Sequence, residues 1–131
     1  MINKNIRIVN NKQNQNDMLE SELDLAPDGY FNEIFVHDVL ETSVDSNILK
    51  KISDKVRKNG VLKLTGIDGH EMCRRVYYGE ESIEQLSESF FGKINRLNSI
   101  VSIKTFFGQL EWNVLFSGIQ DGKYFVEVKK P

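Results

Sequence analysis

The sequence predicts an α/β fold: a partly parallel sheet of four or five strands, with helices and an antiparallel β-hairpin at the C-terminal end. The first observation is a strand pattern at 31–36, a helical pattern at 48–58 and a second strand pattern at 61–65. This order predicts a right-handed crossover with the two strands parallel. The second observation is a pair of apolar runs within 113–128 joined through Asp-Gly, a dipeptide typical of tight hairpins.

Composition narrows the class of protein. The chain has 131 residues, and we expect 1–131 to form one domain around a single core. Its net charge of -2 at pH 7 gives no electrostatic reason to expect nucleic acid as a partner. No run approaches the ~20 apolar residues of a membrane helix, and the start does not resemble a signal peptide. Cys73 is the only cysteine, which excludes an internal disulfide and a metal site made of several cysteines. We therefore expect no metal and a cytoplasmic location. Because the sequence has no membrane helix, we also expect no association with a membrane.

The first 29 residues are polar and carry few signals. Ile6–Val9 (IRIV) predicts a short strand, and the run NNKQNQND at 10–17 predicts a loop. Residues 18–25 fit either an extended segment or a short helix. Pro27-Asp28-Gly29 predicts a turn, because proline fixes φ and glycine accepts a positive φ.

The central crossover occupies residues 30–68. Phe31–Val36 is rich in aromatic and β-branched residues, which is typical of a buried strand. The helix that follows has apolar residues at helical spacing: Ile48, Leu49, Ile52 and Val56. The cap candidates before it are Ser43, Asp45 and Ser46. Its last turn is expected to carry three cations, Lys55, Arg57 and Lys58. Asn59-Gly60 is the expected left-handed stop before the strand Val61–Thr65.

Helices and the hairpin account for the rest of the chain. A glycine-rich loop at Thr65–His70 follows the second strand of the crossover. Helices are predicted over 71–78, 82–91 and 102–110, the second capped by Ser82. The hairpin pairs residues 113–119 with 124–128.

Three segments, in their order along the chain, resemble a known family. They are DLAPDGYFNEIFVHDVLE (24–41), ILKKISDKVRKNGVLKLTGID (48–68) and SIKTFFGQLEWNVLFSGIQDGKYFVEVKK (102–130). These resemble the fourth strand, the next helix and fifth strand, and the last helix with the sixth and seventh strands of class I S-adenosylmethionine-dependent methyltransferases. Within the second segment, 55–61 takes the place of the family's "RvLkpGG", with Asn59 for proline and Val61 for the second glycine. The resemblance covers about residues 24–130 and implies a Rossmann-like sheet.

The chain departs from this family in its first part. The family has there a strand that ends in a glycine-rich loop and a second strand whose acidic residue binds the cofactor ribose. This chain has no glycine before Gly29, and the segment before it is too short for both features. The resemblance is therefore to a truncated methyltransferase that lacks its N-terminal, glycine-rich cofactor-binding half. We expect it to bind no cofactor by itself, and S-adenosylmethionine if it is an enzyme.

His37, Asp38 and Asp68 are the catalytic candidates. His37 and Asp38 end the first strand of the crossover at its carboxyl edge, where open α/β sheets bind ligands, and Asp68 follows the second strand at the same edge. In the family, the loop that corresponds to His37-Asp38 lies near the transferred methyl group. The structural alternatives are a cap for Asp38, a partly buried loop residue for His37 and turn geometry for Asp68.

Other side chains also have two interpretations. Asp24 either corresponds to the family's acidic residue after the third strand or is a surface turn residue. His70 could join His37 in a polar or metal site, although two histidines without tight spacing are weak evidence for a metal. The arginines and tyrosines of 74–78 form either a substrate lip or one side of an amphipathic helix. Cys73 is expected to be a small buried residue and not a nucleophile.

Three functions stay open at this stage, in order of preference. The first is a degenerate methyltransferase-like protein that does not bind S-adenosylmethionine alone and acts as an interaction module or partner subunit. The second is a minimal methyltransferase acting on a small-molecule or glycan acceptor, and the third an unrelated small α/β ligand-binding domain. The expected partner is a complementary protein subunit or a second copy. A homodimer is expected if Ile6–Val9 leaves the edge of Phe31–Val36 open.

Overall fold

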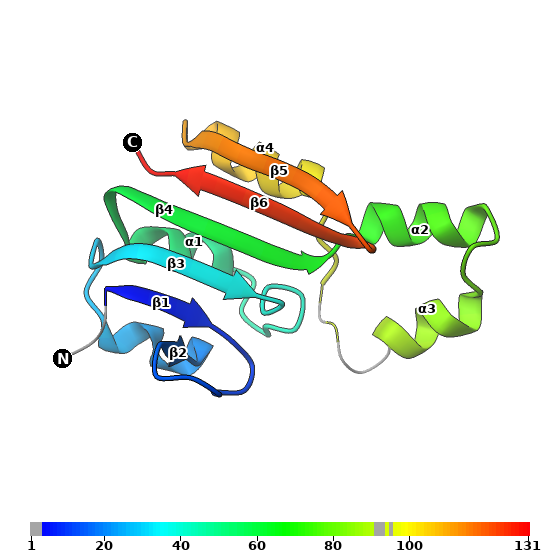
Figure 1. The fold of residues 1–131 in the computed structure, drawn as a ribbon, viewed down its shortest axis with the longest axis horizontal. Coiled ribbons are helices and arrows are strands. Elements are labelled where there is room, and N and C mark those ends of the chain that lie inside the picture. Colours follow the sequence, from blue (N-terminus) through cyan, green and yellow to red (C-terminus); the bar gives the residue numbers. More distant parts are fainter. Residues whose placement is uncertain (1–3, 91–93, 95) are drawn as a thin grey trace.

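The computed structural model describes residues 4–90, 94 and 96–131, which form a six-stranded sheet with helices (Figure 1). The strand order is β2-β1-β3-β4-β6-β5. Four strands are parallel and a hairpin adds two antiparallel strands: β1 (Asn5–Ile8), β2 (Asp17–Met18), β3 (Phe31–His37) and β4 (Val56–Ile67), then β6 (Lys123–Lys129) and β5 (Asn113–Gln120). The predicted fold class is confirmed. The sheet has six strands, one more than the predicted maximum of five. The additional strand is β2, which the prediction missed because its two residues leave no pattern in the sequence.

The N-terminal segment extends the parallel sheet. In β1, Ile6 pairs with Ile34 and Ile8 with Val36, so the predicted cover of the β3 edge is confirmed. After β2 the chain forms the short 3-10 helix η1 (Glu20–Leu25), the helical one of the two forms expected there. The predicted turn before β3 is also present, with Gly29 at φ 69°.

The crossover between β3 and β4 is present, but its helix is shorter than predicted. Helix α1 spans Ile48–Lys55, and the residue before it is Asn47, not one of the predicted caps Ser43, Asp45 and Ser46. Val56 already pairs with Phe31 in the sheet, whereas the next pair joins Val61 to Glu33, so residues 57–60 form an irregularity within β4. Arg57 and Lys58 therefore do not lie in a helical turn. The positive φ of Asn59 (65°) serves this irregularity and not a helix end.

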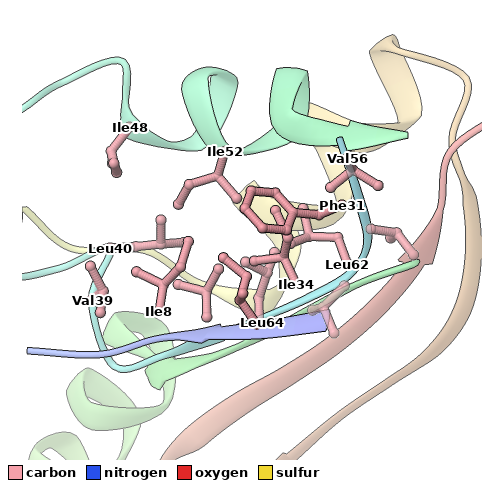
Figure 2. Close-up of a cluster of buried hydrophobic side chains, with 14 of the residues drawn as sticks. Ile8, Phe31, Ile34, Val39, Leu40, Ile48, Ile52, Val56, Leu62 and Leu64 are labelled. Atoms are coloured by element: carbon pink, nitrogen blue, oxygen red, sulfur yellow. The ribbon is translucent and has the colours of Figure 1, made fainter. Parts of the chain in front are cut away.

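The hydrophobic core lies between the sheet and two helices on the same face. Helix α1 covers β3 and β4, and helix α4 (Ile100–Gln109) packs on β5 and β6. Figure 2 shows the α1 part of this core, in which Ile48 and Ile52 point toward the strands. The alternation along the strands is clear, since Ile34, Val36, Leu62, Leu64, Tyr124, Val126 and Val128 are all buried.

Among the residues that the structure describes, the opposite face of the sheet has no helical cover, and no helix lies in front of the strands in the view of Figure 1. Helices α2 (Gly69–Tyr77) and α3 (Ile83–Phe90) extend beyond the end of the sheet. The side chains on the uncovered face are those that alternate with the core residues: Arg7, Glu33, Phe35, Lys63, Thr65, Phe125, Glu127 and Phe116. We call these residues the open face.

Three smaller predictions can be compared with the structure. The hairpin is present, and its turn residues Asp121 and Gly122 both have positive φ, at 53° and 77°. The Ser82 cap is confirmed, since the amide of Gln85 donates to its Oγ, whereas Phe91 lies outside the described residues. Helix α4 begins at Ile100, two residues before the prediction, because Ser99 is its cap. No helix in the described part of the chain is long and apolar enough to cross a membrane.

Candidate functional site

The candidate site lies at the carboxyl edge of the parallel strands. Strands β1, β3 and β4 end at this edge, and the antiparallel strand β6 begins there. Asn10, Asp38 and Ile67 are therefore brought near Lys123, although they are far apart in the sequence. This is the edge at which open α/β sheets bind ligands.

Asp38 is the best-defined polar side chain of the edge. Its Oδ2 accepts a hydrogen bond from Lys123 Nζ at 2.8 Å, and its Oδ1 accepts from Thr65 Oγ1 at 3.3 Å. The backbone at Asp38 has φ 57°, a left-handed conformation that costs free energy for a residue with a side chain. It is fixed by the neighbouring elements, since its amide donates to the carbonyl of Thr65 and its carbonyl accepts from Asn10 Nδ2. The contacts therefore hold one carboxylate in a defined position at the mouth of the edge.

His37 lies next to Asp38 but outside the edge cavity described below. Its Nε2 is 3.6 Å from Asp38 Oδ2, and its ring centroid is 5.8 Å from that of Phe35. The side chain is exposed, not partly buried as the structural alternative predicted. His37 and Asp38 therefore lie side by side at the carboxyl end of β3.

Glu41 is a functional candidate that the sequence reasoning missed. Its side chain is 3% exposed and lies over Gly66, where a Cβ would come within 1.7 Å of Glu41 Oε1. Its Oε2 accepts hydrogen bonds from Tyr124 Oη and Asn98 Nδ2, both at 3.1 Å. Oε1 has no hydrogen-bond partner within the described part of the chain. The signal in the sequence was the small residue Gly66 beside the edge, which makes room for this carboxyl group.

Burial sets the charge of Glu41. Removal from water raises the pKa of Glu41 to about 7, against the opposing effect of hydrogen bonds from Asn98 and Tyr124. Burial also raises the pKa of Tyr124, whose hydroxyl therefore remains a hydrogen-bond donor. Glu41 thus changes its protonation state near neutral pH, close to the Asp38–Lys123 ion pair.

Asp68 has a different environment from the other two catalytic candidates. It is fully buried, and its carboxylate is shared between the first turns of two helices. Oδ1 accepts from the amide of Glu71 in α2 at 2.8 Å, and Oδ2 accepts from the amide of Ile100 in α4 at 2.7 Å. Because both oxygens are used by backbone groups, these contacts favour the structural interpretation of Asp68.

A cavity of about 230 Å³ opens at the edge between Asp38 and Glu41. It is lined by Asn10, Asp38, Glu41, Thr42, Ile67, Ile94 and Lys123. A second hollow of about 250 Å³ adjoins it, shares Asn10 and Asp38, and includes His37. The edge can therefore hold a small polar molecule between a carboxylate, an ammonium group and an apolar wall.

The remaining candidates lie elsewhere. Asp24 pairs with Lys51 at 3.1 Å, and His70 is an exposed residue of α2. In the same helix, Arg74 is held by Glu71 and Glu80 at the surface. Cys73 is exposed, so the prediction that it is buried is wrong: α2 extends beyond the sheet and turns this position to solvent. Within the described ranges, no group of three His, Cys, Asp or Glu side chains could hold a metal ion.

The arrangement of strands and helices is similar to that of solved methyltransferases. One is a protein from Thermotoga maritima, described as a SAM-dependent methyltransferase and possible histamine N-methyltransferase: TM-score 0.59, 15% identity, covering 88% of this chain and 63% of that one. Another is a SAM-dependent methyltransferase from Archaeoglobus fulgidus: TM-score 0.57, 9% identity, 88% and 67% coverage. This is the fold of the class I S-adenosylmethionine-dependent methyltransferases.

A third similar structure contains a protein complex. It joins the Haloferax volcanii Trm112 methyltransferase activator to a protein described as a methyltransferase; the match has a TM-score of 0.61 and 9% identity, over 92% of this chain and 64% of that one. The chain thus spans less than two thirds of the length of the Thermotoga and Haloferax chains. No family model and no curated protein sequence matches it. The likeness is one of fold.

The resemblance assigns β3 and β4 to the fourth and fifth strands of the methyltransferase fold and β5 and β6 to its terminal hairpin, and the observed order β3-β4-β6-β5 has this arrangement. Strand β1 then lies beside the fourth strand, and the loop after it, 10–16, contains no glycine. Asp17, the residue that begins β2, is bound by Arg7 at 3.0 Å and by the amides of Gln13 and Asn14. Asp17 is the acidic side chain nearest to where the family has its ribose-binding acidic residue, and its carboxylate is occupied by contacts within the chain.

Proposed function

We propose that this protein is a methyltransferase-fold interaction subunit that does not bind S-adenosylmethionine by itself. The observation that carries the proposal is the open face: in the described part of the chain, the parallel strands have helices on one side only. Sheets with parallel strands are found almost always with both faces covered, because the crossover helices lie on the faces of such sheets. A protein partner that covers the open face would complete the usual arrangement.

The chemistry of the open face supports a protein partner. An aromatic group lies at its centre, with ring centroids 6.5 Å apart for Phe35 and Phe125 and 5.6 Å apart for Phe116 and Phe125. Phe116 is 56% exposed, which is high for a large apolar side chain on a sheet. Lys63 and Glu33, at 3.1 Å, form an ion pair beside these rings. An amphipathic helix with an apolar centre and polar flanks matches this pattern, as α1 and α4 do on the other face.

The N-terminal segment supports the absence of an independent cofactor site. A glycine-rich loop lets the backbone approach a nucleotide at a helix N-terminus, whereas the loop after β1 has no glycine and no helix follows it before η1. The N-terminal segment thus lacks the glycine-rich backbone cradle that S-adenosylmethionine would need, which supports the proposal.

The partner remains part of the proposal. One of the similar structures is itself a complex between an activator and a protein described as a methyltransferase, so pairing of this fold with a second protein has a precedent.

We place the protein in a reducing, cytoplasmic compartment, because its cysteine is an exposed free thiol.

Partner capture with matched variants tests the proposal. Tagged wild-type chain, Phe125→Asp on the open face and Val44→Asp on a loop are compared in an extract of the source cells. Val44 is 88% exposed and lies away from the open face, so both variants add the same charge to the surface. A partner retained by wild type and Val44→Asp and lost by Phe125→Asp supports the proposal, provided that unfolding curves show both variants folded. A partner retained equally by all three, or no stoichiometric partner, contradicts it.

The second candidate is a minimal S-adenosylmethionine-dependent methyltransferase for a small-molecule or glycan acceptor. The observation that favours it is the edge cavity, where Asp38, Lys123 and Glu41 meet with His37 beside them. Methyl transfer assayed with S-adenosylmethionine and mixed small acceptors tests it, with Asp38→Asn as the matched loss of one charge. Turnover by the wild type that Asp38→Asn abolishes would favour the enzyme. The third candidate, an unrelated ligand-binding domain, loses its basis, since it required the likeness to be accidental.

A further inference from the structure

Strand β5 is the long free edge of the sheet. The sheet ends in β2 on one side and β5 on the other. Strand β2 has two residues, whereas β5 has eight, Asn113–Gln120. Because β1 covers the β3 edge, the reason for expecting a homodimer there no longer applies. Strand β5 is instead the edge at which we expect a second chain, since a long unpaired edge is a template for pairing with another chain.

The backbone groups of β5 that point away from β6 are available. Among the described residues, no backbone hydrogen bond outside the sheet ladder involves 113–120. The two-residue turn at Asp121-Gly122 makes Gln120 and Lys123 the hydrogen-bonded pair that closes the hairpin. Since hydrogen-bonded positions alternate along an antiparallel strand, the amides and carbonyls of Ser117 and Ile119 then point outward.

The side chains of β5 do not protect this edge. The segment NVLFSGIQ contains no charged residue and no proline, which are the usual means of preventing edge pairing. Leu115 is 47% exposed and Ile119 is 45% exposed. The neighbouring helix α4 and its C-cap residue add two more exposed apolar side chains, Val101 and Leu110. A shift of register occurs between Val114 and Phe116, but pairing is regular from Phe116 to Gln120.

We propose that two copies of this chain pair through β5, antiparallel, about a two-fold axis near Gly118. An uncharged strand meets no like charge when it faces its own copy. The two-fold axis places Ser117 of each copy opposite Ile119 of the other, within the regularly paired part of the strand, and forms about four interstrand hydrogen bonds. The contact is isologous and closes at two copies, so it yields a continuous sheet and not a filament. The open face stays free, so this inference is independent of the proposed function.

Mass measurement in solution tests the dimer. Wild type, the double variant Leu115→Lys/Ile119→Lys, the surface control Val44→Lys and the open-face variant Phe125→Asp are measured by sedimentation and light scattering up to about 100 μM. The expected result is a dimer for wild type, Val44→Lys and Phe125→Asp, and a monomer for the double variant with an unchanged fold by circular dichroism. A monomeric wild type overturns the proposal, as does a dimer lost in Phe125→Asp but kept in the double variant.

Hydrogen exchange locates the contact without a substitution. The amides of Ser117 and Ile119 should exchange slowly at high protein concentration and at least about tenfold faster after dilution below the dissociation constant. The amide of Gly118, which points toward β6, provides the internal comparison. Concentration-independent exchange at Ser117 and Ile119 in a dimeric protein would place the interface elsewhere and overturn the proposal.

Discussion

Glu41 makes the stability of this protein depend on pH in an unusual direction. The folded chain holds the pKa of Glu41 at about 7, whereas the ordinary value is 4.5. Between these two pH values the folded state binds more protons than the unfolded state, so the free energy of unfolding falls as pH rises. The full stabilisation is present below pH 4.5 and is lost as pH rises through about 7. The shift corresponds to about 3 kcal/mol from this one side chain.

The substitution Glu41→Gln removes this titration and keeps the shape of the protonated side chain. Its amide oxygen can still accept the hydrogen bonds from Tyr124 and Asn98. Relative to wild type, the variant should therefore gain about 3 kcal/mol between pH 4.5 and pH 8, which is a relative rise of about 10 °C in Tm. Urea unfolding at a series of pH values measures both free energies.

The control is Glu84→Gln, which removes the same charge from an exposed position of α3. Its free energy of unfolding should stay parallel to that of wild type over the whole pH range. If the difference between Glu41→Gln and wild type is also independent of pH, Glu41 is ionised in the folded protein. The description of Glu41 as a buried, protonated group would then be wrong.

Three further substitutions test the construction of the edge. Asp68→Ala leaves the amides of Glu71 and Ile100 without their acceptor. The substitution should lower the free energy of unfolding, measured in urea, by about 2–4 kcal/mol, with a smaller loss for Asp68→Asn. No loss would mean that the two helix caps do not contribute to stability. Gly66→Ala places a Cβ against the carboxyl group of Glu41 and the hydroxyl of Tyr124, so it should cost about 1–3 kcal/mol by the same assay, and a neutral result would contradict the packing. Hydrogen bonds from Arg74 lower the pKa of Glu71 to about 2, so its contribution is present above pH 4.5 and is lost as pH falls toward 2. Glu71→Gln should accordingly flatten the acid side of the pH–stability curve, and an unchanged acid side would exclude this role.

Local patterns predicted the parts of the fold that local chemistry controls. The Asp-Gly turn of the hairpin and the turn at Gly29 depend on residues that accept positive φ, and both occur where the sequence placed them. The pairing of Ile6–Ile8 with β3 followed from the need to cover an edge. The end of α1 was missed because the helical spacing continues to Val56, whereas tertiary pairing of Val56 with Phe31 decides in favour of the strand.

The candidate site depends on contacts that a pattern search does not reveal. Glu41 and Tyr124 are 83 positions apart, and only the folded sheet brings the hydroxyl to the carboxyl group. Asp68 reaches Ile100 across 32 positions, so its second helix cap was equally hidden. His37 and Asp38, by contrast, were already candidates from the sequence, because a strand end marks the ligand edge of an α/β sheet.

Calorimetric titration of the purified chain with S-adenosylmethionine and S-adenosylhomocysteine determines whether this methyltransferase-fold chain binds the cofactor without a second protein. We predict no heat of binding and no shift of Tm for either compound, up to about 1 mM, where a dissociation constant would correspond to only about 4 kcal/mol. Saturable binding at micromolar strength, about 8 kcal/mol, would contradict the proposed function and favour the enzyme.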